Sequence, residues 1–244
     1  MKKIASILLN WNMEKFLVPH IEMLKPHVNK IIFIQCTRPF EPYRIEHNYD
    51  TEPDNSEKIV RNNYPEIEVF NYRPEDKDTK MMFSNAWNFG MSKLQNFDLV
   101  TKFDVDQFFT QDDFLKIFNE IQTTNFENYG LDWSKQSINY HQDFEHGVSD
   151  EVETDPLIVN PKYKFGPLLS YSFPIHILEA DVKMHHFRSF KEWVTPEWIN
   201  FEVPSRYGVY AKDLVQKYTP NNDWIKAPEE IKDLFKRNGN YFNL

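Results

Sequence analysis

Short apolar runs alternate with amphipathic segments along the first half of the chain. Four runs bounded by polar residues are typical of strands buried on both faces, at residues 4–9, 30–35, 67–72 and 98–103. Apolar residues recur at helical spacing in three other segments, 13–28, 82–94 and 110–121. This alternation predicts an α/β fold, in which a mainly parallel sheet is flanked by helices on both faces through residue 122.

Local signals refine the helices and loops. Thr110 and Asp113 form a pattern like a capping box, which predicts the start of the third helix. Pro19 lacks the backbone N–H that a helix interior needs, so we expect it to start or kink the first helix. Residues 37–56 are rich in Pro, Asp, Glu and Asn without periodicity, which predicts a long loop.

The pattern becomes irregular beyond residue 123. An acidic stretch at 149–155 and an aromatic stretch at 162–174 follow neither a strand period nor a helix period. No repeat, low-complexity tract or clear linker interrupts the chain. We therefore expect two halves, 1–122 and 123–244, with the second of mixed α+β structure and packed with the first as one domain.

Composition and charge limit the classes of function. Hydrophobic residues make up 41% of the 244 residues, which is ample for a sizeable core. The net charge of -9 argues against a large surface for nucleic acid or anionic membrane, so DNA is disfavoured as a partner. Cys36 is the only cysteine, which excludes an internal disulfide framework and a cysteine-rich zinc site.

The N-terminal segment MKKIASILLN superficially imitates a secretory signal. Its apolar run stops at Asn10 and no small-residue cleavage pattern follows, so we interpret it as the first strand. No apolar stretch approaches the ~20 residues that a membrane-spanning helix needs. We expect a cytoplasmic protein without a membrane span.

Two polar segments follow predicted strands. Ligands of parallel sheets bind beyond the carboxyl ends of the strands, where the strand order reverses. Asn10, Trp11 and Asn12 follow the first strand, and Asp104 and Asp106 follow the fourth. Trp11 either stacks on a nucleobase or simply packs. Lys102, just before Asp104, either meets a phosphate or is solvated.

The Asp104-x-Asp106 pair admits several chemistries. A calcium loop would need more oxygen ligands and a glycine, but Phe108 and Phe109 stand there. An aspartyl-nucleophile phosphatase would usually place its motif near the chain start, with Thr or Val where Phe108 stands. Two alternatives remain. A solvated turn is the commoner outcome for such a pair judged alone, whereas an open site that holds Mg²⁺ or Mn²⁺ against a diphosphate fits best among the chemistries.

Several motifs in order carry a family resemblance. The chain has SILLNWN at 6–12 and SNAWNFGMSKLQNFDLVTKFDVDQF at 84–108. These segments resemble the nucleotide-sugar-dependent glycosyltransferases of the GT-A fold, mainly over the first half. The resemblance implies a Rossmann-type sheet, a metal bound by Asp106 with Asp104 beside it holding the nucleotide, and a donor contact from Asn88. Trp87 stands where related enzymes often have Arg, and the acidic residue common after the second strand is missing.

The segment 181–193, DVKMHHFRSFKEW, adds a second group of candidates. Many GT-A enzymes complete the metal site with a late histidine, which implies His185 or His186 as a ligand, although either could simply pack. We favour His186, because Phe187 can then anchor its neighbour in the core. Arg188 and Lys191 could neutralise the departing diphosphate.

An inverting transferase also needs a general base for the acceptor hydroxyl, normally a carboxylate. The candidates are Asp143, Glu145, Glu179 and Asp181, which the sequence does not rank, and a retaining mechanism would need none. The resemblance implies a hexosyl- or pentosyltransferase that uses a nucleotide-diphosphate sugar and Mn²⁺ or Mg²⁺. The first half would bind the donor and the second the acceptor, which could be a glycan, a protein or a hydroxylated DNA base. The alternative is a carbohydrate-binding protein of the same fold without turnover.

Overall fold

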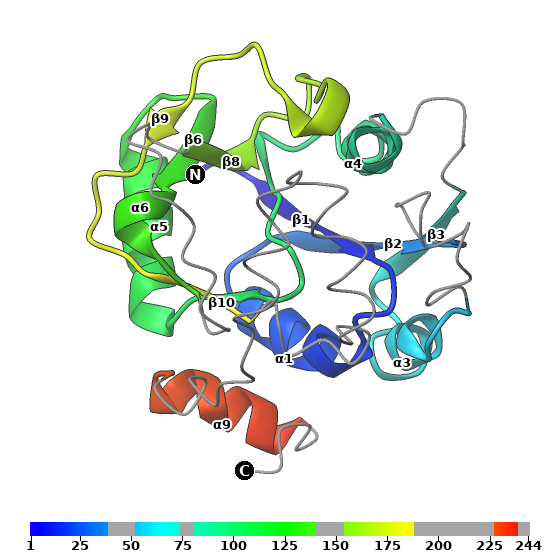
Figure 1. Ribbon diagram of the computed structural model, residues 1–244. Helices are drawn as coiled ribbons and strands as arrows, with labels where there is room; N and C mark the ends of the chain where they lie inside the picture. The colour runs from blue at the N-terminus through cyan, green and yellow to red at the C-terminus, as the bar shows by residue number, and fades with distance from the viewer. Residues whose placement is uncertain (39–51, 74–80, 140–153, 188–226, 239–244) are drawn as a thin grey trace, which may run out of the picture.

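A seven-stranded sheet forms the centre of the computed structural model, which describes residues 1–38, 52–73, 81–139, 154–187 and 227–238 (Figure 1). The strand order is β3-β2-β1-β4-β8-β6-β9. The bounds of these strands are β1 Ile4–Asn10, β2 Lys30–Cys36, β3 Glu68–Tyr72, β4 Leu99–Thr101, β6 Asn128–Asp132, β8 Thr154–Val159 and β9 His176–Ile177.

The strand order reverses between β1 and β4. Strands β1, β2 and β3 pair in parallel and run outward from β1, whereas β4 returns to pair in parallel on the other side of β1. Beyond β4 the sheet becomes mixed, because β8 is antiparallel to both β4 and β6. The predicted α/β class with a mainly parallel sheet is therefore confirmed, and the carboxyl ends of β1 and β4 meet at its switch point.

Helices cover both faces of the sheet (Figure 1). Helices α1 and α3 lie on one face and α4 on the other, and each face has its own apolar core. The helices are α1 Glu14–Leu24, α3 Ser56–Asn63, α4 Met82–Ser92, α5 Gln111–Thr123, α6 Trp133–Gln136 and α9 Glu229–Arg237, with the short 3₁₀ turn η1 at Pro167–Leu169.

The two local helix signals have different outcomes. Thr110 caps α5, since its Oγ1 accepts a hydrogen bond from the backbone N–H of Asp113 at 3.2 Å, as predicted. Pro19 does not start the first helix, which was one of the two expected alternatives, because α1 runs from Glu14 through Pro19 to Leu24. The prolyl ring lies buried with the apolar stripe of α1, whose packing on the sheet compensates for the missing N–H.

A second, three-stranded sheet extends beyond β4, in the order β5-β10-β7. Its strands are β5 Gln107–Phe108, β7 Ser137–Asn139 and β10 Met184–His186. Strand β10 is antiparallel to β5, with His186 opposite Gln107, and parallel to β7. This sheet brings a segment from the second half of the chain against the Asp-x-Asp turn.

A membrane span is not found in the described parts of the chain, where every helix is too short or too polar to cross a bilayer.

Candidate functional site

The Asp-x-Asp motif forms a tight turn directly beyond β4, at the switch point of the sheet. The backbone N–H of Gln107 donates to the carbonyl oxygen of Asp104 at 2.9 Å. The side chain of Gln107 closes the turn, because its Oε1 accepts from the backbone N–H of Asp104 at 3.0 Å. Gln107 was not among the predicted site residues, and its buried amide is what fixes the position of Asp104.

Asp106 and His186 come together at this turn. Asp106 is only 1% exposed, and its Oδ2 lies 3.5 Å from Nε2 of His186. The backbone supports the pair, because the N–H of Phe187 donates to the carbonyl oxygen of Asp106 at 2.9 Å. Asp106 therefore does not face solvent, and of the two alternatives for the motif the solvated turn is excluded for this residue.

His185 occupies the other face of β10. Successive side chains of a strand point to opposite faces, and His185 lies opposite Phe108 rather than Gln107. Burial lowers the pKa of His185 to about 4, so its imidazole is neutral at physiological pH. The structure brings His186, and not His185, to the carboxylate of Asp106.

A further histidine, His20 of α1, packs on Phe108 next to this turn and feels the charge of Asp106. Its ring is fully buried and packs edge-on against Phe108, with the ring centroids 5.5 Å apart. Burial lowers the pKa of His20 to about 4, although the charge of Asp106 and the backbone of Gln107 act in the opposite direction. Sequence reasoning missed His20, whose only signal was a polar residue within the apolar stripe of its helix.

The donor set at the turn suits a divalent ion that takes further ligands from a substrate. Asp106 and His186 supply one carboxylate and one imidazole, a combination of oxygen and nitrogen that Mn²⁺ accepts. Within the described residues, no group of three or more His, Cys, Asp or Glu side chains converges as a complete metal cage. A metal held by these two side chains would take its remaining ligands from diphosphate oxygens or water.

The polar residues at the carboxyl end of β1 make hydrogen bonds to β2 and to residues 52–54. Asn10 is buried, and its Nδ2 donates to Oε1 of Gln35 at 3.0 Å, whereas its Oδ1 accepts no hydrogen bond from the described residues. Asn12 adopts a left-handed backbone conformation (φ 52°), and its side chain bonds to the backbone of Glu52 and Asp54. Trp11 is 3% exposed and packs in the core on the α4 face.

The helix of the Asn-x-Gly motif is fastened to the segment before η1. Asn88 makes two hydrogen bonds with the backbone of Phe165, each 2.9 Å long: Nδ2 donates to the carbonyl oxygen, and Oδ1 accepts from the N–H. Ser84 of the same helix accepts from the N–H of Leu169 at 2.9 Å. The amide of Asn88 is thus committed to tertiary structure on both of its sides.

Lys102 lies inside the protein. It is 2% exposed, and its Nζ stands 5.4 Å from the ring of Trp87 and 5.8 Å from the ring of Phe165. The alternative of a solvated lysine was therefore wrong, because two aromatic faces enclose the ammonium group through cation–π contacts. Trp87 serves here as one wall around Lys102.

The predicted general bases and the predicted cationic residues are not found at the Asp106–His186 pair within the described part of the chain. Asp181 and Glu179 are exposed, and the backbone carbonyl of Asp181 accepts from Nζ of Lys116 at 3.3 Å. Four predicted residues lie outside the described part of the chain, namely Asp143, Glu145, Arg188 and Lys191.

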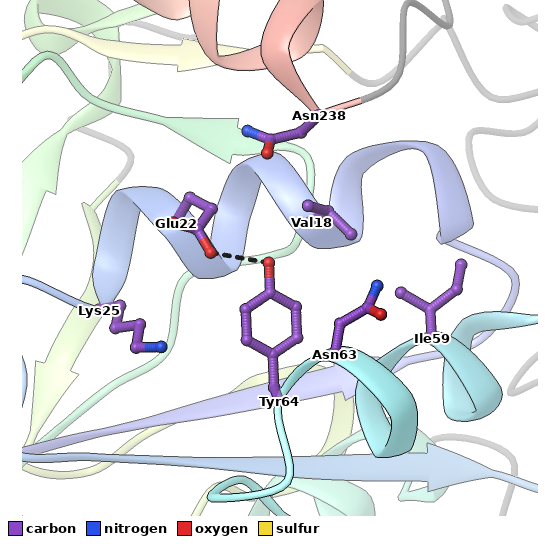
Figure 2. Close-up of a pocket in the computed structure, with 7 residues that line it drawn as sticks. All are labelled: Val18, Glu22, Lys25, Ile59, Asn63, Tyr64 and Asn238. Atoms are coloured by element: carbon purple, nitrogen blue, oxygen red, sulfur yellow. Dashed lines mark hydrogen bonds between the residues drawn. The ribbon is translucent and has the colours of Figure 1, made fainter.

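A separate pocket of about 510 Å³ opens between α1, α3 and the end of α9 (Figure 2). Within it, the hydroxyl of Tyr64 donates to Oε1 of Glu22 at 2.8 Å, which contributes, after burial, to a raised pKa of Tyr64. The other lining residues are Val18, Lys25, Ile59, Asn63 and Asn238. None of the predicted site residues lines this pocket, so it is distinct from the Asp106–His186 pair.

Comparison with known proteins adds matches among solved structures only. No family profile and no curated protein matches the chain. Glucosyl-3-phosphoglycerate synthase from Mycobacterium tuberculosis, solved with Mn²⁺, UDP-glucose and phosphoglyceric acid, is 12% identical over 57% of this chain and 44% of its own, with a TM-score of 0.37. TarS from S. aureus is 10% identical over 88% of this chain and 42% of its own, with a TM-score of 0.45.

The chain covers less than half the length of either of these proteins. At such identities and TM-scores the likeness assigns no activity to this chain.

Proposed function

We propose that this protein is a metal-dependent glycosyltransferase, which moves a sugar from a nucleotide-diphosphate donor to an acceptor hydroxyl. The observation that carries the proposal is the pairing of the buried Asp106 with His186 at the switch point of the sheet. A buried carboxylate beside an imidazole is a natural place for a cation, and the switch point is where α/β sheets bind nucleotides.

Asp106 and His186 would hold the metal, and the imidazole ligand favours Mn²⁺ over Mg²⁺. When bound, the metal would act as a Lewis acid that stabilises the charge growing on the departing diphosphate. Asp104, whose backbone N–H is bound by the side chain of Gln107, would orient the nucleotide and could add a carboxylate to the metal. The histidine closes the turn from the second half of the chain, which would help exclude water from the donor.

The first half, residues 1–122, would bind the donor. Asn10 supports this assignment, because its Oδ1 is buried at the end of β1 and accepts no hydrogen bond within the described residues, so it offers an acceptor to a ligand N–H. Trp11, Asn12 and Asn88 would act by holding the walls of the donor site, and Lys102 by its charge behind the Asp-x-Asp turn.

The second half, residues 123–244, would bind the acceptor. Arg188 and Lys191 follow His186 closely in the sequence and would neutralise the leaving diphosphate. In an inverting reaction one of Asp143, Glu145, Glu179 or Asp181 would take the proton of the acceptor hydroxyl, so that the oxygen attacks the anomeric carbon as the bond to the diphosphate breaks.

The test is donor hydrolysis and transfer. The purified chain would be incubated with a panel of nucleotide sugars and Mn²⁺, with and without simple sugar acceptors, and free nucleotide would be measured. We expect release with one donor that stops on chelation and in Asp106→Asn. Absence of release with every donor, together with sugar binding that needs no metal, would contradict the proposal and favour the carbohydrate-binding alternative.

A further inference from the structure

Phenylalanine rings lie directly behind the Asp106–His186 pair. Phe108 follows Gln107 in β5, and Phe187 follows His186 at the end of β10. Their ring centroids are 5.5 Å apart and their planes stand at 86°. Both side chains are buried, so the two strand segments that carry the pair are joined by these rings as well as by backbone hydrogen bonds.

The C-terminal helix α9 adds one ring that touches both of them. Phe235 is 2% exposed, and its ring centroid lies 4.9 Å from that of Phe108 and 5.6 Å from that of Phe187. It also packs edge-on against Phe16 of α1 at 6.1 Å. Figure 1 shows α9 against α1, below the strand β10.

Helix α9 is also fastened at its first turn. Oε1 of Glu230 accepts a hydrogen bond from the backbone N–H of Gln111, the first residue of α5, at 2.8 Å. One turn of α9 thus contacts the helix that follows the Asp-x-Asp turn, and Phe235 contacts the two strands that carry the pair.

The small sheet needs such support, because β5 has two residues and β10 has three. Strands this short make few backbone hydrogen bonds and are not stable on their own. Side-chain packing must therefore help set how closely β10 approaches the turn. Within the part of the chain that the structure describes, Phe235 of α9 supplies a ring that contacts both Phe108 and Phe187.

We propose that Phe235 is a positioning residue, which holds β10 against the turn so that His186 and Asp106 converge on one divalent ion. This inference rests on the proposed function, in which these two side chains bind the metal. Loss of the Phe235 ring would leave both ligands present but weaken the packing that holds them together. We expect a loss of metal affinity near the lower end of the about 10–100-fold change that outer-shell partners of metal ligands cause.

The test compares Phe235→Ala with Phe33→Ala. Phe33 is also fully buried, but it lies in β2 of the central sheet, so its truncation opens a cavity away from the pair. The probe is inorganic diphosphate titrated calorimetrically with and without Mn²⁺, at a temperature where circular dichroism shows each variant folded. We expect Phe235→Ala to weaken Mn²⁺-dependent binding at least about 10-fold and Phe33→Ala to leave it within about twofold.

If an alanine variant fails to fold, Phe235→Leu and Phe33→Leu serve the same comparison. We expect Phe235→Leu to weaken Mn²⁺-dependent binding, though less than the alanine variant would, and Phe33→Leu to leave it unchanged. A second readout needs no metal: the amide of Phe187, which donates to Asp106, should exchange its hydrogen faster in the Phe235 variants and not in the Phe33 variants. Equal effects of the two positions on affinity and exchange would overturn the role of Phe235.

The proposed function can fail separately. A wild-type chain that binds diphosphate equally with and without Mn²⁺ would overturn the metal site and, with it, this role of Phe235. Wild-type binding that requires Mn²⁺, and that Phe235→Ala leaves unchanged, would overturn only the role of Phe235.

Discussion

The imidazole of His186 meets the carboxylate of Asp106 across two short antiparallel strands, with Nε2 and Oδ2 separated by 3.5 Å. The residues come from opposite halves of the chain, and the hydrogen bond from the N–H of Phe187 to the carbonyl oxygen of Asp106 fixes their register. A shift of β10 by one residue would place His185 at the carboxylate instead, because neighbouring strand residues face opposite sides. The neighbouring histidine is therefore a natural control for the function of the pair.

The first prediction uses this control. His186→Ala should weaken Mn²⁺-dependent binding of a nucleoside diphosphate at least about 10-fold, because it removes a proposed ligand. His185→Ala should change the binding little, because its side chain lies on the other face of β10. Calorimetric titration with UDP and GDP, each with and without Mn²⁺, measures both variants. If His185→Ala weakened binding as much as His186→Ala, the assignment of the ligand would be wrong.

The second prediction concerns the clamp between α4 and Phe165, by which we mean the two hydrogen bonds of the Asn88 side chain with the Phe165 backbone. Asn88→Ala should lower the free energy of unfolding by about 1–3 kcal/mol, because it leaves a buried backbone N–H and carbonyl without their partner. Asn85→Ala is the matched control, since Asn85 is an exposed asparagine of the same helix. Urea unfolding followed by circular dichroism measures both. Equal stability of the two variants would show that the clamp contributes nothing.

The third prediction concerns Asp54, whose carboxylate joins two helix starts. Its Oδ2 accepts from the N–H of Glu14 in α1, and its Oδ1 accepts from the N–H of Ser56 in α3, each at 2.9 Å. Asp54→Ala should therefore lower the thermal midpoint, with a loss of about 1–2 kcal/mol. Asp54→Asn keeps one of the two acceptor oxygens and should lie between wild type and alanine. An asparagine variant less stable than the alanine variant would contradict this capping role.

The fourth prediction is a loss of stability in acid. Burial against Phe114 lowers the pKa of His27 below its ordinary value of 6.5, although the charge of Glu230 partly opposes the shift. At a pH between the folded and unfolded pKa values of His27, the unfolded chain binds more protons than the folded chain. The contribution of His27 to the free energy of unfolding is therefore complete above about pH 6.5 and is lost as the pH falls below it. The buried His20 and His185, with pKa values of about 4, act in the same direction.

Urea unfolding at pH 7 and pH 5 measures this effect. His27→Phe keeps a ring beside Phe114 without a titrating group, so its stability should fall less between the two pH values than that of the wild type. One histidine changes the slope of the free energy of unfolding against pH by at most about 1.4 kcal/mol per pH unit. A variant whose stability falls as steeply as that of the wild type would exclude His27 as a contributor.

The sequence predicted the first four strands of the central sheet and missed strands whose geometry is irregular. Strands β1 to β4 are short apolar runs, and their pattern alone locates them. Strand β8 contains Pro156, which argues against an inner strand, and β6 has a register irregularity between Tyr129 and Gly130. Their place in the sheet depends on pairing with each other and with β4, which no local pattern contains.

The candidate site also contains residues that the local sequence indicates and residues that only the tertiary structure brings together. Asp104 and Asp106 follow a strand and are visible locally, but the approach of His186 depends on the second sheet. His20 and Gln107 look like ordinary helix and turn residues. The packing of His20 on Phe108 and the hydrogen bond of Gln107 to Asp104 appear only in the folded chain. Lys102 was expected near a phosphate or in solvent, and its burial between two rings follows from long-range packing of Phe165 on α4.

The most direct test of the metal-dependent site is Asp106→Asn, titrated with UDP and GDP in the presence and absence of Mn²⁺. Because Asp106 is buried, the isosteric asparagine is the least disruptive change, and an unchanged far-ultraviolet circular dichroism spectrum would verify folding. We predict that the wild type binds one of these nucleotides more tightly with Mn²⁺, and that Asp106→Asn loses the increase. Undiminished Mn²⁺-dependent binding by the folded variant would contradict the proposed role of Asp106.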